Sequence, residues 1–289
     1  MIHSNQQIIA CIDGTELSEA VCDYAVWISK QTHAPLTLLH TINHHHETAL
    51  KADASGNIGL GTQEHLLDEI AELEEKQNRL KLKAGKLLLN AAKQRVIEDG
   101  IDNPQCLQRH GDLIEVVIEL EQQIGVLVLG RRGRVHENQP DQIGSKLEAV
   151  IRSLHRPILI INDAFHAPQR IMLAYDGGKA AEKAVEMVAR SPLFKGLECH
   201  LVCVKKNEES AADLLQQAAA KIQASGDIRL ISKKLQGKPE EVLCQYQAEH
   251  DIDMTVMGAF SHTRLHEMLL GSFTHKMLLK NKKPLLLLR

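Results

Sequence analysis

The chain has 289 residues, 44% of them apolar and 25% charged, and a formal net charge of −3. This length favours two globular domains, and the near-neutral charge with only 3% aromatic residues argues against a nucleic acid or an anionic membrane as partner. The six cysteines form no C-x-x-C pair, the start Met1–Gln7 has no signal-peptide core, and no apolar run reaches the length of about 20 residues that spans a bilayer. We therefore expect a cytoplasmic protein.

Strand and helix signals alternate along the first half of the chain. Strands are expected at residues 8–12, 36–42, 105–109, 126–129 and 158–161, and helices at 18–29, 64–98 and 113–123. The clearest strands are continuous apolar runs, which indicates that both faces of the sheet are covered. Strands that are separated by helices pair in parallel with right-handed crossovers.

The second half of the chain repeats the first. Four landmarks recur in the same order, and they begin at Ile8, Gly111, Val126 and Gly144 in one half and at Ile171, Gly237, Met254 and Gly271 in the other. We therefore expect an α/β fold of two tandem open parallel five-stranded sheets with helices on both faces. The predicted domains are residues 1–163 and 168–289, and the first domain carries an insert around residues 44–75.

The insert and the helix that follows it contain two conspicuous patterns. We interpret His44-His45-His46 as a solvated loop rather than a metal site, because consecutive histidines cannot all face one ion. An apolar stripe with helical spacing is expected to be core rather than a groove for a partner. The stripe comprises Leu66, Ile70, Leu73, Leu80, Leu87 and Leu88.

Glycines gather in the loop that follows the fourth strand of each half. In an open parallel sheet this loop lies where the strand order reverses, and ligands bind there. A Gly after a buried strand lets the backbone approach a ligand, and a Gly-Ser that opens a helix aims unpaired N–H groups at an anion. Asp13 and Asp176 end the first strands and are expected at the same crevice. Singly, each feature is explained as a turn or a helix cap, and only the matched spacing in both halves favours a ligand site.

This combination resembles tandem members of the universal stress protein (UspA) family, whose nucleotide-binding pattern is G-x2-G-x9-G-[ST] with an Asp after the first strand. The resemblance covers nearly the whole chain apart from the insert and implies a Rossmann-like fold similar to the adenine nucleotide alpha hydrolases. It implies a stress-response protein that binds ATP or a related adenine nucleotide, with Mg as a further candidate. The second-half site would comprise Asp176, Val204 by its backbone, Gly258, Ser261, Gly271, Ser272, Phe273 by its backbone, and Thr274. The first-half site would comprise Asp13, Gly130, Gly133, Gly144 and Ser145.

Both halves depart from the family pattern. Ser261 stands at the second Gly position of the second half, whereas the first half has one extra residue before Gly144. We favour the second half as the competent site. Arg131, Arg132 and Arg134 either hold phosphates in the first half or form a solvated basic loop.

Three kinds of function remain open. The chain is a binding protein for an adenine nucleotide, a scaffold that acts through protein–protein interaction without nucleotide, or an enzyme of a related fold. No catalytic residue is assigned, because the sequence has no nucleophile elbow and no paired carboxylates, so at most weak ATP hydrolysis is expected. Family members pair their last strands, and here residues 157–161 and 284–288 are expected to pair within one chain as an internal pseudo-dimer. A homodimer of the chain is a further option.

Overall fold

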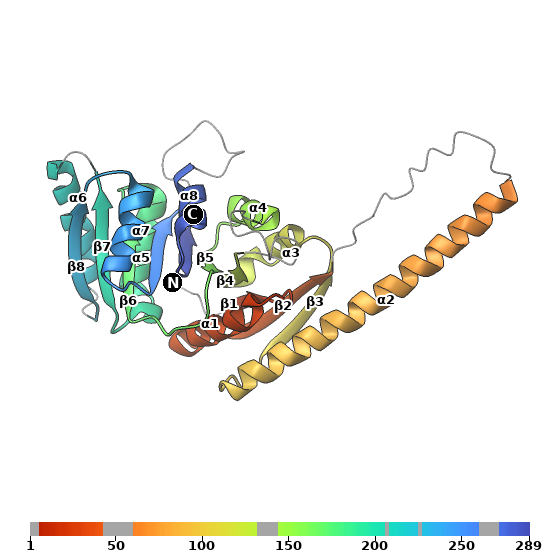
Figure 1. Cartoon of the computed structure of the whole chain (residues 1–289). Helices are drawn as coiled ribbons and strands as arrows, with labels where there is room; N and C mark the ends of the chain where they lie inside the picture. Colours follow the sequence, from red (N-terminus) through yellow and green to blue (C-terminus); the bar gives the residue numbers. More distant parts are fainter. Residues whose placement is uncertain (1–5, 43–59, 132–143, 206–207, 225–226, 260–271) are drawn as a thin grey trace.

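The computed structural model describes residues 6–42, 60–131, 144–205, 208–224, 227–259 and 272–289. These residues form one ten-stranded sheet with the order β3-β2-β1-β4-β5-β10-β9-β6-β7-β8 (Figure 1). The first half of the chain supplies β1 to β5 and the second half supplies β6 to β10 in the same relative order. The predicted α/β fold and its duplication are therefore confirmed by the strand topology.

The predicted strands of the first half agree with the observed ones to within two residues. The strands are β1 (Gln7–Cys11), β2 (Leu36–Ile42), β3 (Gln105–His110), β4 (Ile124–Gly130), β5 (Ile158–Ile161), β6 (Arg170–Ala174), β7 (Glu198–Val204), β8 (Arg229–Leu235), β9 (Met254–Gly258) and β10 (Leu285–Leu288). The helices are α1 (Leu17–Thr32), α2 (Leu60–Glu98), α3 (Leu113–Glu119), α4 (Ser145–Ser153), α5 (Lys179–Arg190), α6 (Glu208–Gln223), α7 (Pro239–Glu249) and α8 (Ser272–Lys280), with the 3-10 turns η1 (Glu121–Gln123) and η3 (Pro192–Phe194). Within the described ranges, no helix is both long enough and apolar enough to cross a membrane.

The two halves join through their last strands. All strand pairs within a half are parallel, whereas β5 and β10 pair in antiparallel fashion with Leu286 opposite Leu159. The expected pairing of these strands within one chain is confirmed, and neither of them is left as a sheet edge. Beside this junction, the side-chain amide of Asn162 donates to the carbonyls of Asn281 at 3.0 Å and Lys283 at 2.9 Å.

Two buried apolar layers cover the two faces of the sheet. Successive side chains of β1 alternate between them, since Ile8 and Ala10 belong to the layer under α1 and α2 and Ile9 belongs to the layer under α3 and α4. All three residues are fully buried. In the second half, α5 and α6 cover the first face, and α7 and α8 cover the second. Burial on both faces explains why the strands are continuously apolar.

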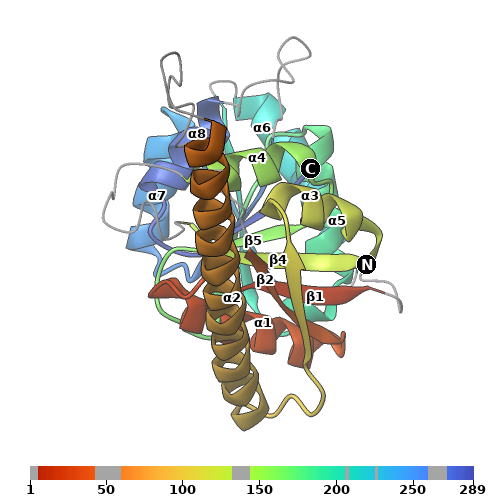
Figure 2. The same cartoon turned by 90° about the vertical axis from the view of Figure 1, so that its right-hand side faces the viewer.

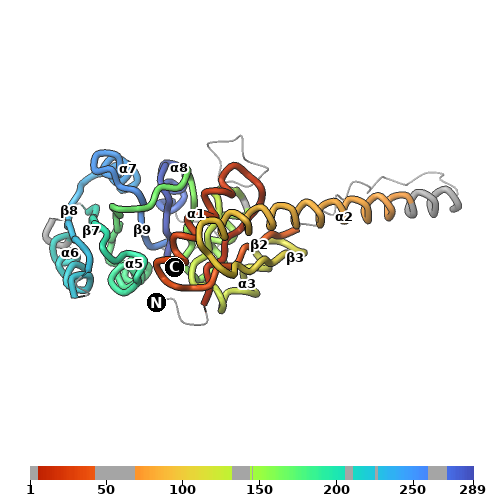
Figure 3. The backbone as a smooth tube through the Cα atoms, turned by 90° about the horizontal axis from the view of Figure 1, so that it is seen from below, coloured from red at the N-terminus to blue at the C-terminus, as the bar shows by residue number. Residues whose placement is uncertain are grey.

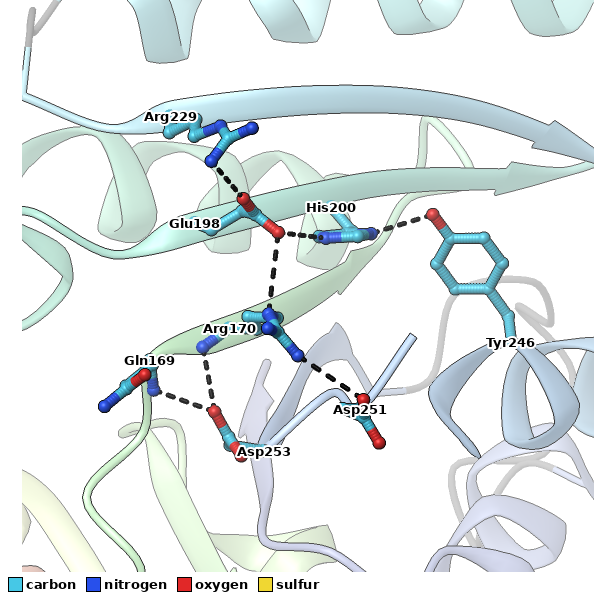
Figure 4. Close-up of polar contacts among 8 residues, drawn as sticks. All are labelled: Gln169, Arg170, Glu198, His200, Arg229, Tyr246, Asp251 and Asp253. Carbon is cyan, nitrogen blue, oxygen red and sulfur yellow. Dashed lines mark hydrogen bonds and ion pairs between the residues drawn. The ribbon is translucent and has the colours of Figure 1, made fainter. Parts of the chain in front are cut away.

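A polar network lies at the amino-terminal ends of strands β6, β7 and β8 (Figure 4). The buried His200 lies 2.9 Å from the Glu198 carboxylate through Nε2 and 2.8 Å from the Tyr246 hydroxyl through Nδ1. A carboxylate only accepts hydrogen bonds, so Nε2 donates to Glu198, while Nδ1 and the Tyr246 hydroxyl share the second hydrogen bond. The hydrogen bond from His200, with the charges of Arg229 and Arg170, lowers the pKa of Glu198 although burial opposes this. The network ties the first residues of β6, β7 and β8 to α7.

The long helix α2 departs from expectation. It has 39 residues and projects beyond the rest of the described chain, as Figures 1 and 3 show from two directions and Figure 2 shows from the side on which it projects. Leu73, Leu80 and Leu87 are 60%, 58% and 70% exposed, so the prediction that the leucine stripe is core is wrong for them. Leu89 and Ala92 are buried instead. Helical spacing shows that an apolar face exists, but it does not show what covers that face.

Candidate functional site

A cavity of about 440 Å³ opens at the carboxyl ends of β6, β7 and β9. The strand order of the second half reverses between β6 and β9, which is where open parallel sheets bind their ligands. Residues of α5, α7 and α8 complete its walls. The lining comprises Ala174, Tyr175, Asp176, Ala181, Val202, Val204, Lys205, Pro239, Glu240, Leu243, Met257, Gly258, Ser272, Phe273 and Lys276.

Most of the residues predicted for the second-half site meet in this cavity. Those that line it are Asp176, Val204, Gly258, Ser272 and Phe273. Thr274 is 2% exposed and does not line the cavity. Ser261 and Gly271 lie outside the described residues. The cavity thus joins the Asp after the first strand, the end of the second strand and the start of α8.

Asp176 forms both a turn and a wall of the cavity. It lies two residues after the end of β6 and is partly buried. Its Oδ1 accepts a hydrogen bond from the backbone N–H of Gly178 at 2.8 Å, which helps to lead the chain into α5. The intervening Gly177 has φ +83°, a conformation that favours glycine. The Asp-Gly pair therefore serves the local fold and also presents a carboxylate to the cavity.

Helix packing alone requires glycine at position 258. A Cβ atom at this position would lie 2.6 Å from the backbone nitrogen of Ala181 and 2.7 Å from the carbonyl carbon of Ala180. The start of α5 therefore passes directly over the end of β9. Because Gly258 and Ala181 both line the cavity, this contact also fixes the shape of one wall.

Three charged residues of the cavity are not singled out by the sequence pattern, namely Lys205, Glu240 and Lys276. Lys276 Nζ lies 2.7 Å from Glu240 Oε1, and the Glu240 side chain is only 8% exposed. This hydrogen bond is the main cause of the lowered pKa of Glu240, so the carboxylate is ionised at neutral pH. With Asp176, the lining holds two cations and two anions. The sequence does not predict the pair of Glu240 and Lys276, because charged residues near helix ends are common.

Asp13, the counterpart of Asp176, is held by its own turn. Its Oδ1 accepts hydrogen bonds from Thr15 N at 3.1 Å, Thr15 Oγ1 at 2.8 Å and Ser18 Oγ at 3.0 Å. This carboxylate oxygen organises the entry into α1, as Asp does in many turns. These hydrogen bonds agree with the interpretation of Asp13 as a turn residue, one of the two roles that the sequence left open.

The other first-half candidates are only partly described. Gly130 ends β4, and Gly144 precedes α4 with φ −59°, which any residue adopts. Gly133 and the side chain of Ser145 lie outside what the structure describes. Arg131 Nη1 donates to the carbonyls at the end of α8, at 3.1 Å to Leu278 and 3.3 Å to Leu279. This guanidinium group therefore joins the two halves.

The family model of the universal stress protein family matches residues 4–162 and, a second time, residues 168–289. The chain belongs to the universal stress protein family. Universal stress protein Slr1230 of Synechocystis sp. is 30% identical over 286 residues, which cover 98% of this chain and 100% of that protein. The agreement extends over both halves, so this relative shares the whole tandem arrangement.

Solved structures show the same fold in distant relatives. A universal stress protein from Archaeoglobus fulgidus aligns over 99% of both chains with a TM-score of 0.70 and 21% identity. The functionally unknown protein PA1789 of Pseudomonas aeruginosa aligns over 98% of this chain and 92% of its own, with a TM-score of 0.62 and 15% identity. At these identities the comparison concerns the fold, so the chemistry of the cavity must be argued from its own residues.

Proposed function

We propose that the second universal stress domain binds an adenine nucleotide in the cavity at the carboxyl ends of β6, β7 and β9, as part of a stress response. One observation carries this proposal: a single cavity combines apolar walls, a carboxylate, the start of a helix and two lysines. A nucleotide needs an apolar surface for its base, hydrogen-bonding groups for its ribose, and donors or positive charge for its phosphates. The volume of about 440 Å³ is in the range usual for small-molecule sites.

The base and ribose find partners on the sheet side of the cavity. Val202, Leu243 and Met257 supply apolar surface that suits a purine ring. The Asp176 carboxylate accepts hydrogen bonds and suits a ribose hydroxyl or the amino group of the base. The backbone of Val204, at the end of β7, adds peptide groups beside them.

The phosphates find partners at the start of α8. This helix begins at Ser272, and its first N–H groups have no partner within the helix and face outward with the positive end of the helix dipole. Lys205 and Lys276 add positive charge to the same cavity. We assign phosphate contacts to Ser272 and to the backbone of Phe273. The hydroxyl of Thr274 is left out because the side chain is buried away from the cavity.

ATP with magnesium is the form of ligand that the family resemblance favours. Among the described residues, no group of three or more His, Cys, Asp or Glu side chains is arranged to hold a metal ion. We therefore propose that magnesium would be held mainly by the phosphates, with the Ser272 hydroxyl as a candidate ligand. We assign no residue as a base for ATP hydrolysis, so the activity that we propose is binding.

Glu240 is expected to lower the affinity of the cavity for phosphate, because it already binds Lys276. In the structure, its carboxylate holds Lys276 at 2.7 Å. A bound phosphate would compete with Glu240 for the same ammonium group. Lys276→Met should therefore weaken ATP binding, whereas Glu240→Gln should strengthen it by removing a negative charge and releasing Lys276. Opposite signs for two neighbouring substitutions are not expected from a general loss of structure.

Titration calorimetry of the full chain with ATP, ADP, AMP and GTP tests the proposal. Asp176→Ala should lower the affinity for ATP by about tenfold or more, whereas the matched variant Asp13→Ala should leave it nearly unchanged. The stoichiometry decides whether the first-domain residues form a second site. A folded chain that binds no ATP at millimolar concentration would refute the proposal and leave the scaffold function. The exposed leucines of α2 are the observation that favours that alternative.

A further inference from the structure

An uncovered row of leucines runs along α2. Leu73, Leu80 and Leu87 follow one another at intervals of seven residues, and each is more than half exposed. Leu89 and Ala92, by contrast, are buried against the sheet. Successive residues of a helix are turned by about 100°, so Leu87 points roughly 200° away from Leu89. The row therefore lies on the side of α2 that faces away from the sheet.

The spacing of the row is that of a two-stranded coiled coil. When the three leucines occupy d positions of the heptad, the a positions are Ile70, Gln77 and Ala84. Monomeric proteins rarely leave large apolar surfaces in water, and in this row only Gln77 interrupts the apolar side chains. A second helix with the same spacing would cover it, and a second copy of this chain supplies one. The last strands cannot serve this purpose, since β5 and β10 already pair within the chain.

The charges along α2 are divided into two blocks. Every charged residue at positions 69–75 is acidic, and every charged residue at positions 76–86 is basic. In a parallel pair of helices, Glu69 would face the partner's Glu74, and the next flanking pair would be lysine against lysine. Like charges would then oppose each other at both of these flanking pairs. The sequence of α2 therefore disfavours a parallel pair.

An antiparallel pair brings the acidic block of each helix against the basic block of the other. When the twofold axis lies near the boundary between the blocks, Ile70 packs against the partner's Leu80, and Glu69 lies beside the partner's Lys83 on both sides of the axis. Like charges meet only at the axis itself, where Glu74 and Lys76 each face the same residue of the partner, so the antiparallel pair has fewer like-charge contacts than the parallel one. We infer that α2 joins two copies of this chain through an antiparallel coiled coil. This inference does not depend on nucleotide binding, because α2 contributes nothing to the lining of the cavity.

Sedimentation velocity of the full chain measures the association. Wild-type protein at micromolar concentration should sediment with twice the chain mass of 32.2 kDa. Leu80→Lys places two charges in the seam and should weaken the dimer by about 100-fold or more. Ile118→Lys, at a residue of α3 that is 47% exposed, is the matched control and should leave the dimer intact. A monomeric wild-type chain, or a dimer that survives Leu80→Lys, would overturn the inference.

Glu69→Lys tests the orientation of the two helices. In the antiparallel pair it sets lysine against the partner's Lys83, so the dimer should weaken by about threefold at low salt, and adding Lys83→Glu should restore it. In a parallel pair the same substitution would face the partner's Glu74 and tighten the dimer. All three residues are on the projecting helix, and unchanged circular dichroism would show that the variants fold. A tighter dimer in Glu69→Lys would overturn the antiparallel arrangement.

Discussion

Gly258→Ala tests the closest backbone approach at the cavity. The added methyl carbon would lie 2.6 Å from the backbone nitrogen of Ala181, whereas ordinary contacts of a Cβ atom begin at 3.4 Å, so the overlap is about 0.8 Å. The carbonyl carbon of Ala180 lies nearly as close, at 2.7 Å. Both atoms belong to the backbone of α5 and cannot rotate away as the tip of a side chain would. The start of the helix must therefore move.

The displacement of α5 sets the size of the effect. The helix buries Ala184, Val185 and Val188 completely against the sheet, so a shift of its start disturbs close-packed contacts. Overpacking of this kind costs about 1–3 kcal/mol, and the loss of a flexible glycine from the unfolded chain returns about 0.5–1 kcal/mol. Because both close contacts are with backbone atoms, we expect the upper part of the overpacking range, about 2–3 kcal/mol. The net loss of about 1–2.5 kcal/mol corresponds to a Tm lower by roughly 2–10 °C in a domain of this size.

Thermal unfolding of the full chain by calorimetry checks this value. The double variant Ala180→Gly/Gly258→Ala removes one of the crowding atoms, the Ala180 Cβ at 2.8 Å, but keeps the two backbone contacts. Once the change in Tm caused by Ala180→Gly alone has been subtracted, the double variant should therefore recover only part of the Tm lost in Gly258→Ala. ATP affinity should fall in Gly258→Ala, because Ala181 also lines the cavity. An unchanged or raised Tm would refute the view that α5 lies directly on the end of β9.

Two further predictions concern the network at the amino-terminal edge of the second domain. Tyr246→Phe removes the hydroxyl that is hydrogen-bonded to the buried His200, so the free energy of unfolding in urea should fall by about 1–2 kcal/mol, and an unchanged midpoint would contradict this geometry. The pKa of Glu198 in the folded state lies below its ordinary value of 4.5, so the unfolded chain binds this proton more readily. The stabilisation is therefore complete above about pH 5 and is lost as the pH falls below that range, and Glu198→Gln should flatten the loss.

The strand positions could be predicted because burial on both faces leaves a strong signal. Residues 36–42 form a strand with the expected bounds, since a short, largely apolar run is typical of a strand covered on both faces. The environment of α2 could not be predicted in the same way. A leucine every seven residues has the same pattern whether it meets its own sheet or another chain. In this fold Leu89 and Ala92 contact the sheet, which turns Leu80 outward.

The site could be predicted where its residues end strands or begin helices. Asp176, Gly258 and Ser272 were found this way, because parallel strands bring their carboxyl ends to one edge. The contact of Gly258 with the start of α5 is a further reason for glycine that the sequence does not reveal. The pair of Glu240 and Lys276 was missed because the two residues are 36 positions apart in the chain and lie on two different helices. Such a contact depends on how α7 and α8 pack, which no local pattern records.

The duplicated fold also explains why the two halves differ in chemistry. Thr15 and Ser18 supply the hydroxyl groups that hold Asp13, and the corresponding positions of the second half are Gly178 and Ala181. Neither residue has a side-chain donor, so in the second half the turn is held by the backbone N–H of Gly178. Ala181 instead forms part of the cavity wall. With Gly178 and Ala181 in place of Thr15 and Ser18, the Asp176 carboxylate receives no hydroxyl hydrogen bond from these two positions, and it lines the cavity while it still holds the turn through Gly178.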